Sequence, residues 1–141
     1  MSFTATAKPI GNSLRHEINV NGRHVIVTDE PESLGGTDTG PAPHELLPAT
    51  LASCISTTVA LYAKRKDWDL NGLSVDVTYD NEAEPRSFDV TLHLPDGLTE
   101  NQVERLRRVA DTCPVRRALE GDFVFDERTE AGEDQQPVGL V

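Results

Sequence analysis

Hydrophobic and polar positions alternate in four short stretches of the chain, which predicts a fold built on antiparallel strands. Ser13–Val20 and Arg23–Thr28 are β-prone and are joined by Asn21-Gly22, the residue pair that best accepts positive φ in a two-residue turn. Further along, Leu73–Tyr79 and Phe88–Leu94 place apolar side chains at every second position. We therefore predict two antiparallel hairpins.

The region from Glu45 to Lys66 changes to a helical spacing and predicts the longest helix of the chain. Its large apolar residues do not form one stripe, and most positions between them are alanine, serine or threonine. A helix that is apolar or small all round is packed on most of its sides. We therefore predict that this helix is buried on nearly every side, with Cys54 in its middle.

Two shorter helices are predicted in the second half. Thr99 can cap the first of them, and this helix should end at Asp111 or Thr112. Pro114 interrupts the helical pattern there, because proline removes a backbone donor and disfavours helical geometry in the residue before it. A short helix from Val115 to Glu120 follows, and Cys113 lies at the joint between the two helices.

The remaining segments decide the fold class. Residues 29–43 contain three prolines and three glycines, too many for a regular element, and predict a long loop that forms the rim of a site. Phe123–Phe125 is expected to be a closing strand. The order of elements predicts a single α+β domain over residues 1–127. Residues 128–141 are polar, acidic and turn-rich, which favours a flexible tail.

Charge and composition exclude several function classes. The chain has 24 acidic and 13 basic residues among 141, a formal net charge of −11, so nucleic acids and anionic membrane surfaces are repelled. We expect no membrane span, which needs an apolar run of ~18–20 residues, and no export signal. The sequence therefore predicts a soluble, cytoplasmic protein.

The two cysteines are the strongest candidates for chemistry, because a reducing cytosol disfavours a permanent structural disulfide between Cys54 and Cys113. A thiol is more acidic at a helix N-terminus and beside cations. Cys113 meets both conditions, since Arg116 and Arg117 follow it, whereas Cys54 in mid-helix meets neither. From the residues alone, Cys113 is predicted to be the more acidic thiol and Cys54 a structural residue.

Other candidate sites are weaker. The histidines lack the spacing of a metal site, and no third cysteine is available for zinc. The glycines between Gly35 and Gly40 lack the Lys-Ser/Thr ending of a phosphate-binding loop. Glu45 is most simply a carboxylate in the first helical turn, where the helix dipole favours it. The four histidines are His16, His24, His44 and His93.

Three segments resemble motifs of the OsmC/Ohr family, the osmotically inducible and organic hydroperoxide resistance proteins. Gly40–Cys54 resembles the helix-opening motif of the family, Ala63–Trp68 the end of its first long helix, and Ala110–Val115 its second-cysteine motif. The resemblance covers residues 3 to 127. It implies an α+β fold of order β-β-(β)-α-β-β-α-β, in which two chains intertwine as a homodimer with their long helices packed centrally.

The resemblance also implies a cysteine-based peroxidase that reduces organic hydroperoxides in oxidative stress defence, without metal or other cofactor. It assigns Cys54 as the peroxidatic residue and Cys113 as the resolving residue, which reverses the assignment from the helix dipole. An arginine from the amino-terminal strands, held by a glutamate, is expected to stabilise the Cys54 thiolate. An external dithiol of lipoyl-protein or thioredoxin type would reduce the resulting disulfide.

The sequence departs from the family pattern around the proposed activating residues. His44 stands where better-known branches have the glutamate, and Glu45 follows one residue later, a turn of about 100° on a helix. Ser13 aligns with the family arginine, so Arg15 is the nearest substitute and Arg23 the alternative. His44 in place of the glutamate favours a second hypothesis, an OsmC-like redox-sensing or ligand-binding protein with little turnover.

Overall fold

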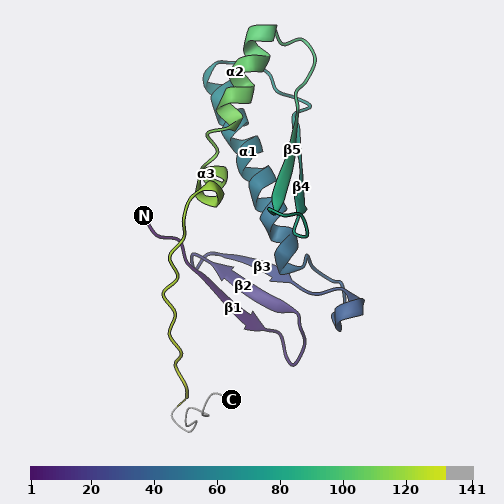
Figure 1. The fold of residues 1–141 in the computed structure, drawn as a ribbon, viewed down its shortest axis with the longest axis vertical. Coiled ribbons are helices and arrows are strands. Elements are labelled where there is room, and N and C mark those ends of the chain that lie inside the picture. Colours follow the sequence, from purple (N-terminus) through teal and green to yellow (C-terminus); the bar gives the residue numbers. More distant parts are fainter. Residues whose placement is uncertain (133–141) are drawn as a thin grey trace.

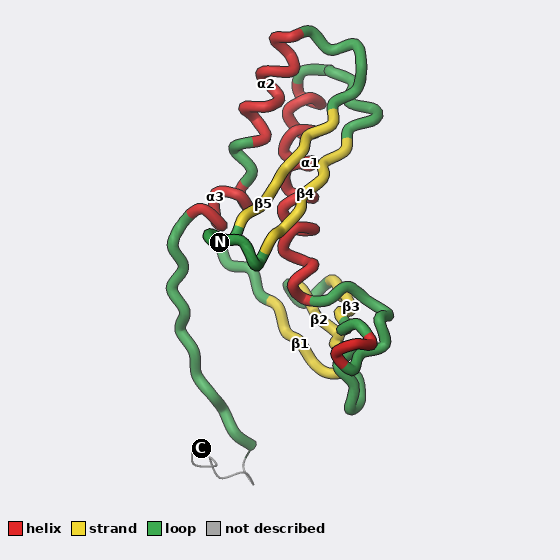
Figure 2. Tube along the Cα trace, turned by 45° about the vertical axis from the view of Figure 1, so that its right-hand side comes forward, coloured by secondary structure: helices red, strands yellow, loops and turns green. Residues whose placement is uncertain are grey.

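The computed structural model describes residues 1–132, which form a three-stranded sheet, a long helix, a two-stranded sheet and two further helices. The predicted α+β class is therefore confirmed. Figure 1 shows the long helix as the central element, with the two-stranded sheet along one side and the shorter helices along the other. The three-stranded sheet lies at the N-terminal end of this helix, apart from the other elements (Figures 1 and 2).

The amino-terminal hairpin forms, with shorter strands and a turn one residue longer than predicted. β2 (His16–Val20) pairs antiparallel with β3 (His24–Thr28), and Val20 lies opposite His24, so that Arg23 belongs to the turn. The other two turn residues adopt positive φ, 53° at Asn21 and 70° at Gly22. A further strand, β1 (Ala5–Pro9), pairs with the other edge of β2 and supplies the third strand that the family resemblance implied. Every residue of β1 is exposed, so this strand has neither of its faces covered within one chain.

The loop over residues 29–43 contains more regular structure than the sequence predicted. Single 3₁₀ turns form at Glu32–Leu34 (η1) and Pro43–Glu45 (η2). Prolines do not prevent them, because a proline near the start of a helical turn occupies a position whose N–H needs no intrahelical partner. Gly35 ends the first turn with a φ of 94°, a left-handed conformation that favours glycine.

The long helix α1 (Leu46–Arg65) has nearly the predicted ends, but its predicted burial on nearly every side is wrong for the single chain. Only every fourth residue is buried, forming one stripe along the helix, and Leu61 on another face is 56% exposed. Strand β4 and helices α2 and α3 cover the buried stripe and leave the small-residue face uncovered. The stripe consists of Leu51, Ile55, Val59 and Ala63.

The second hairpin and the two shorter helices agree with the sequence. β4 (Ser74–Asp80) pairs antiparallel with β5 (Ser87–His93). In α2 (Glu100–Ala110), the Thr99 and Gln102 side chains cap the first turn reciprocally, at 3.1 and 2.8 Å. The helix ends one or two residues earlier than predicted, and α3 (Pro114–Glu120) follows the expected break.

The predicted strand at Phe123–Phe125 does not form. The described residues after α3 are irregular, and the side chains of Val124 and Phe125 are 87% and 89% exposed. A strand needs a neighbouring strand for its backbone groups, and no strand of residues 1–132 pairs with this segment. Of the predicted flexible tail, residues 128–132 are irregular, and residues 133–141 lie outside the described part of the chain.

One helical region of the chain has the length and composition of a membrane span, which by itself is weak evidence and does not overturn the expectation of no membrane span. The helical region Pro43–Arg65 is long and apolar enough to cross a membrane by these two criteria. The central helix of a soluble protein passes the same test, since it is apolar on the face that packs against the core. In this structure α1 is the helix around which β4, α2 and α3 pack.

Candidate functional site

The two cysteines are brought together by helices α1 and α3. Cys113 precedes α3 and is completely buried beside Leu51 and Ile55, and the partly exposed Cys54 side chain packs against the same cluster. Both cysteines are free thiols. The two residues are 59 positions apart in the sequence, and it is the packing of α3 against α1 that places them next to each other. Their proximity allows a reversible disulfide.

The environment of Cys113 contradicts the prediction that it is the more acidic thiol. Burial raises the pKa of Cys113, and the adjacent Cys54 side chain raises it further. The backbone N–H groups of Val115 and Arg116, at the start of α3, lower this pKa but do not outweigh burial. The helix terminus therefore lowers the pKa of Cys113 as predicted, but desolvation of this completely buried thiol raises it by more.

A cavity of about 410 Å³ lies between α1, strand β5 and helix α3. Leu51, Phe88 and Leu119 belong both to the cavity wall and to the apolar cluster around the two thiols. Val90 completes the apolar part of the wall, and charged residues line the remainder. An apolar ligand bound in this cavity would therefore lie against the cluster that contains the thiols. The charged residues are Arg86, Arg116 and Glu120.

The candidate activating arginine lies outside this cluster. Arg15 immediately precedes β2, and its Nε atom is buried without a hydrogen-bond partner among residues 1–132. Most buried polar atoms of native proteins have a hydrogen-bond partner, which makes Arg15 Nε an exception within these residues. Arg23, the alternative, lies in the turn between β2 and β3 and is exposed. Both arginines belong to the amino-terminal sheet and its turn, whereas Cys54 lies on α1 and Cys113 precedes α3.

The two other predicted site residues lie in η2, just before α1. The Oε1 atom of Glu45 accepts a hydrogen bond of 3.0 Å from the backbone N–H of Ala42, so this carboxylate caps the turn that leads into the helix. His44 is exposed beside it. Of the predicted site residues, the structure places Cys54 and Cys113 together in one apolar cluster.

The sequence of the chain matches the profile of the OsmC-like proteins over residues 36–128. This segment contains both cysteines, the cavity and most of the elements that place them. The chain belongs to the OsmC-like protein family. No curated protein sequence gives a significant match to this OsmC-like chain.

Solved structures of similar fold agree with this assignment. A Psychrobacter arcticus protein assigned to the osmotic stress induced and detoxification response has a TM-score of 0.69 at 25% identity, over 84% of this chain and 88% of its own. An OsmC-like protein from Mycoplasma pneumoniae has a TM-score of 0.64 at 21% identity, over 86% and 89%. An organic hydroperoxide resistance protein from Elizabethkingia anophelis has a TM-score of 0.60 at 24% identity, over 86% and 90%.

Asp29 organises the loop of this OsmC-like chain that the sequence predicted as a site rim. Its buried carboxylate accepts five hydrogen bonds, from the backbone of Glu30 and from the backbone and hydroxyl groups of Thr37 and Thr39. The Thr37 hydroxyl has the largest part in holding the pKa of Asp29 far below its usual range. Sequence reasoning missed this residue, although an aspartate followed by two threonines across a glycine-rich turn is a usable signal.

We expect Asp29→Asn to open this loop. The N–H and hydroxyl groups that now donate to the carboxylate would face an N–H₂ group in the variant, which cannot accept their hydrogen bonds. Cleavage within residues 30–43 by limited proteolysis should become faster. Since folding lowers the pKa of Asp29, its stabilisation is present above about pH 4, its ordinary value, and is lost as pH falls further. In the parent protein, the protection of this loop from proteolysis should therefore weaken as the pH falls. In Asp29→Asn, cleavage of the loop should not show this dependence on acid pH. Asp38→Asn removes the same charge at an exposed position of the same loop, and it should change neither the cleavage rate nor its dependence on pH.

Proposed function

We propose that this OsmC-like protein is a thiol-dependent peroxidase that reduces organic hydroperoxides to alcohols as part of oxidative stress defence. The observation that carries the proposal is the placement of Cys54 and Cys113 in one apolar cluster, part of which also forms the apolar side of a cavity. Hydroperoxide resistance proteins among the structures of similar fold support the same activity. The cavity wall favours alkyl or lipid hydroperoxides over hydrogen peroxide, because an apolar tail gains free energy when it leaves water.

The chemistry begins at Cys54. Its thiolate attacks the distal oxygen of the hydroperoxide, the O–O bond breaks, and the leaving alkoxide takes a proton to become an alcohol. Cys54 is then a sulfenic acid. The Cys113 thiol attacks this sulfur, the S–S bond forms, and the sulfenic oxygen leaves as water after accepting the thiol proton. An external dithiol restores both thiols and is itself oxidised to a disulfide.

Unequal burial supports this division of roles. Cys54 is partly exposed and can meet a substrate, whereas Cys113 is completely buried. A raised pKa keeps Cys113 a neutral thiol, which is a poor nucleophile toward peroxide in the resting protein. The same burial places Cys113 beside Cys54, where it is ready to attack the sulfenic acid. Cys54 is therefore the peroxidatic residue and Cys113 the resolving residue of the proposal.

We also propose that the active unit is a homodimer. The faces that one chain leaves uncovered are large: the exposed strands of the three-stranded sheet, the small-residue face of α1 and the side chains of Phe123–Phe125. Small residues such as Ala49, Ser53 and Ala60 allow two helices to approach closely. A second copy would cover these faces and could supply the group that Arg15 lacks.

In the proposed dimer, Arg15 stabilises the Cys54 thiolate, with His44 or Glu45 orienting it. The buried Nε of Arg15 favours this residue over the exposed Arg23, because an arginine in water gives a thiolate little help. Glu45 already caps its own turn through Oε1 and has a second oxygen for the arginine. The capping contact also favours the alternative function, a redox sensor or ligand-binding protein in which Glu45 is purely structural.

Steady-state kinetics separate the two functions. The peroxidase should consume many equivalents of cumene hydroperoxide per subunit when dithiothreitol is supplied in excess, and should react more slowly with hydrogen peroxide. A sensor would oxidise once, giving the Cys54–Cys113 disulfide in stoichiometric yield without sustained turnover. Thiols that remain unoxidised by cumene hydroperoxide would contradict both functions. Sedimentation of the same sample should give a dimer.

A further inference from the structure

The loop between β3 and α1 joins the two segments that carry the candidate activating residues. Arg15 immediately precedes β2 in the three-stranded sheet, and His44 and Glu45 lie in η2, at the start of α1. Within residues 1–132, the extensive contacts of this sheet are among its own strands. Figure 2 shows the sheet apart from the helices, with the loop as the connection. The conformation of residues 29–43 therefore sets the position of Arg15 relative to η2 in one chain.

The carboxylate of Asp29 is the centre of this loop. Asp29 follows the last residue of β3 and is 1% exposed. Thr37 and Thr39 each donate two hydrogen bonds to its Oδ2 atom, one from the backbone and one from the hydroxyl, at 2.5 to 3.2 Å. The backbone N–H of Asp29 donates a further bond of 3.1 Å to the carbonyl oxygen of Pro41. One residue thus ties the end of the sheet to the segment just before η2.

The end of the sheet that Asp29 holds is also the end that carries Arg15. In the antiparallel register of β2 and β3, the last pair at this end is His16 opposite Thr28. Arg15 and Asp29 are the next residues of the two segments, so both leave the sheet at the same point. A displacement of the loop at Asp29 would therefore be felt directly beside Arg15.

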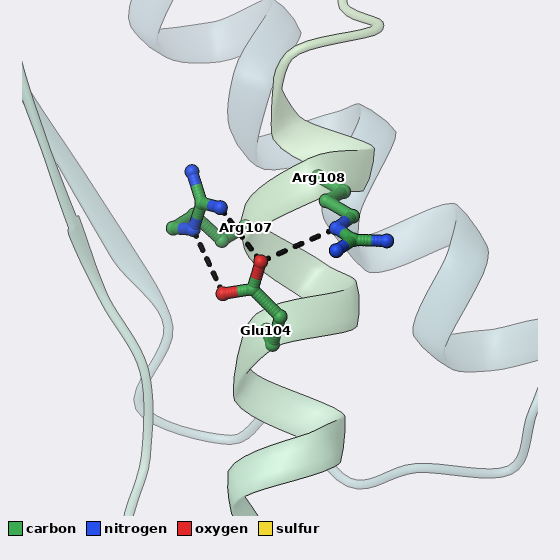
Figure 3. Close-up of polar contacts among 3 residues, drawn as sticks. All are labelled: Glu104, Arg107 and Arg108. Atoms are coloured by element: carbon green, nitrogen blue, oxygen red, sulfur yellow. Dashed lines mark hydrogen bonds and ion pairs between the residues drawn. The ribbon is translucent and has the colours of Figure 1, made fainter.

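A carboxylate elsewhere in the chain shows what distinguishes Asp29. Figure 3 shows Glu104 bound to Arg107 and Arg108, which lie three and four positions later on the same helix, at 2.6 and 3.2 Å. These solvent-accessible ion pairs join one turn of α2 to the next. The threonine partners of Asp29 lie eight and ten positions away, across a loop. A buried carboxylate is costly unless it is fully hydrogen-bonded, so Asp29 favours the one loop conformation that supplies these donors.

From this arrangement we infer that Asp29 is a positioning residue of the proposed active site. It holds Arg15 and the η2 turn in one fixed arrangement, so that the guanidinium group is directed at the Cys54 thiolate. This inference rests on the proposed function, because Asp29 acts through Arg15 and does not itself touch Cys54 or the hydroperoxide. Without the carboxylate, the loop opens and Arg15 loses its fixed orientation.

The test follows the alkylation of Cys54 by iodoacetamide over a range of pH, by mass spectrometry of the peptide that contains it. In Asp29→Asn the rate should rise only at higher pH than in the parent, as in Arg15→Ala, and at neutral pH it should be about 3- to 10-fold lower. Loss of a negative charge would by itself favour the thiolate and move the profile to lower pH. The direction of the change therefore separates positioning from a direct charge effect.

A double variant separates positioning from a general loss of stability. If Asp29 acts through Arg15, the combination of Arg15→Ala with Asp29→Asn should be alkylated within about twofold of the rate for Arg15→Ala alone. Two independent effects would instead multiply. The value of kcat/KM for cumene hydroperoxide should show the same non-additivity. Asp38→Asn, at an exposed position of the same loop, should match the parent in both measurements.

A second pair of variants keeps the test valid if Asp29→Asn does not fold. Thr37→Val removes the hydroxyl that donates to Asp29 and should move the alkylation profile in the same direction, by a smaller amount. Thr37→Ser keeps a hydroxyl and should restore the parental profile. If the contact served stability alone, Thr37→Val would unfold at a lower urea concentration than the parent with an unchanged alkylation profile.

Three results would overturn the inference. The alkylation profile of Asp29→Asn could coincide with that of the parent or move to lower pH. The effects of Asp29→Asn and Arg15→Ala could multiply. Arg15→Ala alone could leave the profile unchanged, in which case there is no activating arginine for Asp29 to position. If the parent does not consume cumene hydroperoxide, the proposed peroxidase fails, but alkylation needs no turnover and still tests the positioning of Arg15.

Discussion

Replacing Cys54 by serine is expected to reduce kcat/KM for cumene hydroperoxide by more than about 10³-fold, because a serine hydroxyl remains protonated at neutral pH and the covalent route is lost. The decrease should be measured with excess dithiothreitol at several hydroperoxide concentrations. Ser56→Ala, which removes a hydroxyl elsewhere on the same helix, serves as the control and should change the rate by less than about twofold. Undiminished turnover by the Cys54 variant would contradict the proposed mechanism.

The corresponding change at Cys113 should have a different outcome. In Cys113→Ser, the first oxidation of Cys54 should proceed at close to the parental rate, because the buried thiol takes no part in O–O cleavage. No disulfide can then form, so the Cys54 sulfenic acid should persist, react with dimedone and progress to the sulfinic acid under excess peroxide. Mass spectrometry distinguishes these products. If Cys113→Ser abolishes the first oxidation and Cys54→Ser does not, the two roles are reversed.

The pKa of Cys113 shows where reasoning from local sequence fails. Pro114 and two arginines place Cys113 in a sequence context that lowers a thiol pKa, and the N–H groups of Val115 and Arg116 do act in that direction. The neighbours that bury Cys113, Leu51 and Ile55, come from a helix more than fifty positions earlier in the sequence. Desolvation by tertiary packing is larger than the effect of a single helical turn. The proposed assignment of the peroxidatic role to Cys54 comes from the motif resemblance and not from the local sequence.

The fold was predictable wherever the determinants were local. The Asn21-Gly22 turn, the reciprocal cap at Thr99 and the break at Pro114 each depend on residues within a few positions, and each forms at the expected place. Predictions that needed a partner surface were wrong for the single chain, namely a helix buried on all sides and a strand at Phe123–Phe125. Hydrophobicity indicates that a face will be covered but does not specify which chain covers it.

In the proposed dimer, the activating arginine is the part of the site that most depends on a second chain. Arg15→Ala should slow the oxidation of Cys54 by cumene hydroperoxide about 10- to 100-fold, since an adjacent cation favours a charged group by one to three powers of ten. The pH dependence of alkylation by iodoacetamide should also change: in this variant the rate should rise only at higher pH, because the cation that favours the thiolate has been removed. Arg15→Lys should recover part of the rate, and Arg23→Ala should leave it unchanged. The opposite result for the two alanine variants would assign the role to Arg23.

Mixed dimers then show whether Arg15 acts within its own chain or across the dimer. Alone, Cys54→Ser should be inactive and Arg15→Ala should show only its slow residual reaction, which is subtracted. If Arg15 reaches the Cys54 of the other subunit, a dimer of one chain of each variant has one complete site, formed by the arginine of one chain and the cysteine of the other. Random mixing of equal amounts should restore about a quarter of the parental sites, because half of the dimers are mixed and each has one such site. If Arg15 acts within its own chain, no mixed dimer contains a complete site and mixing restores nothing. We expect the first result, since the Nε atom of Arg15 is buried and has no hydrogen-bond partner among residues 1–132.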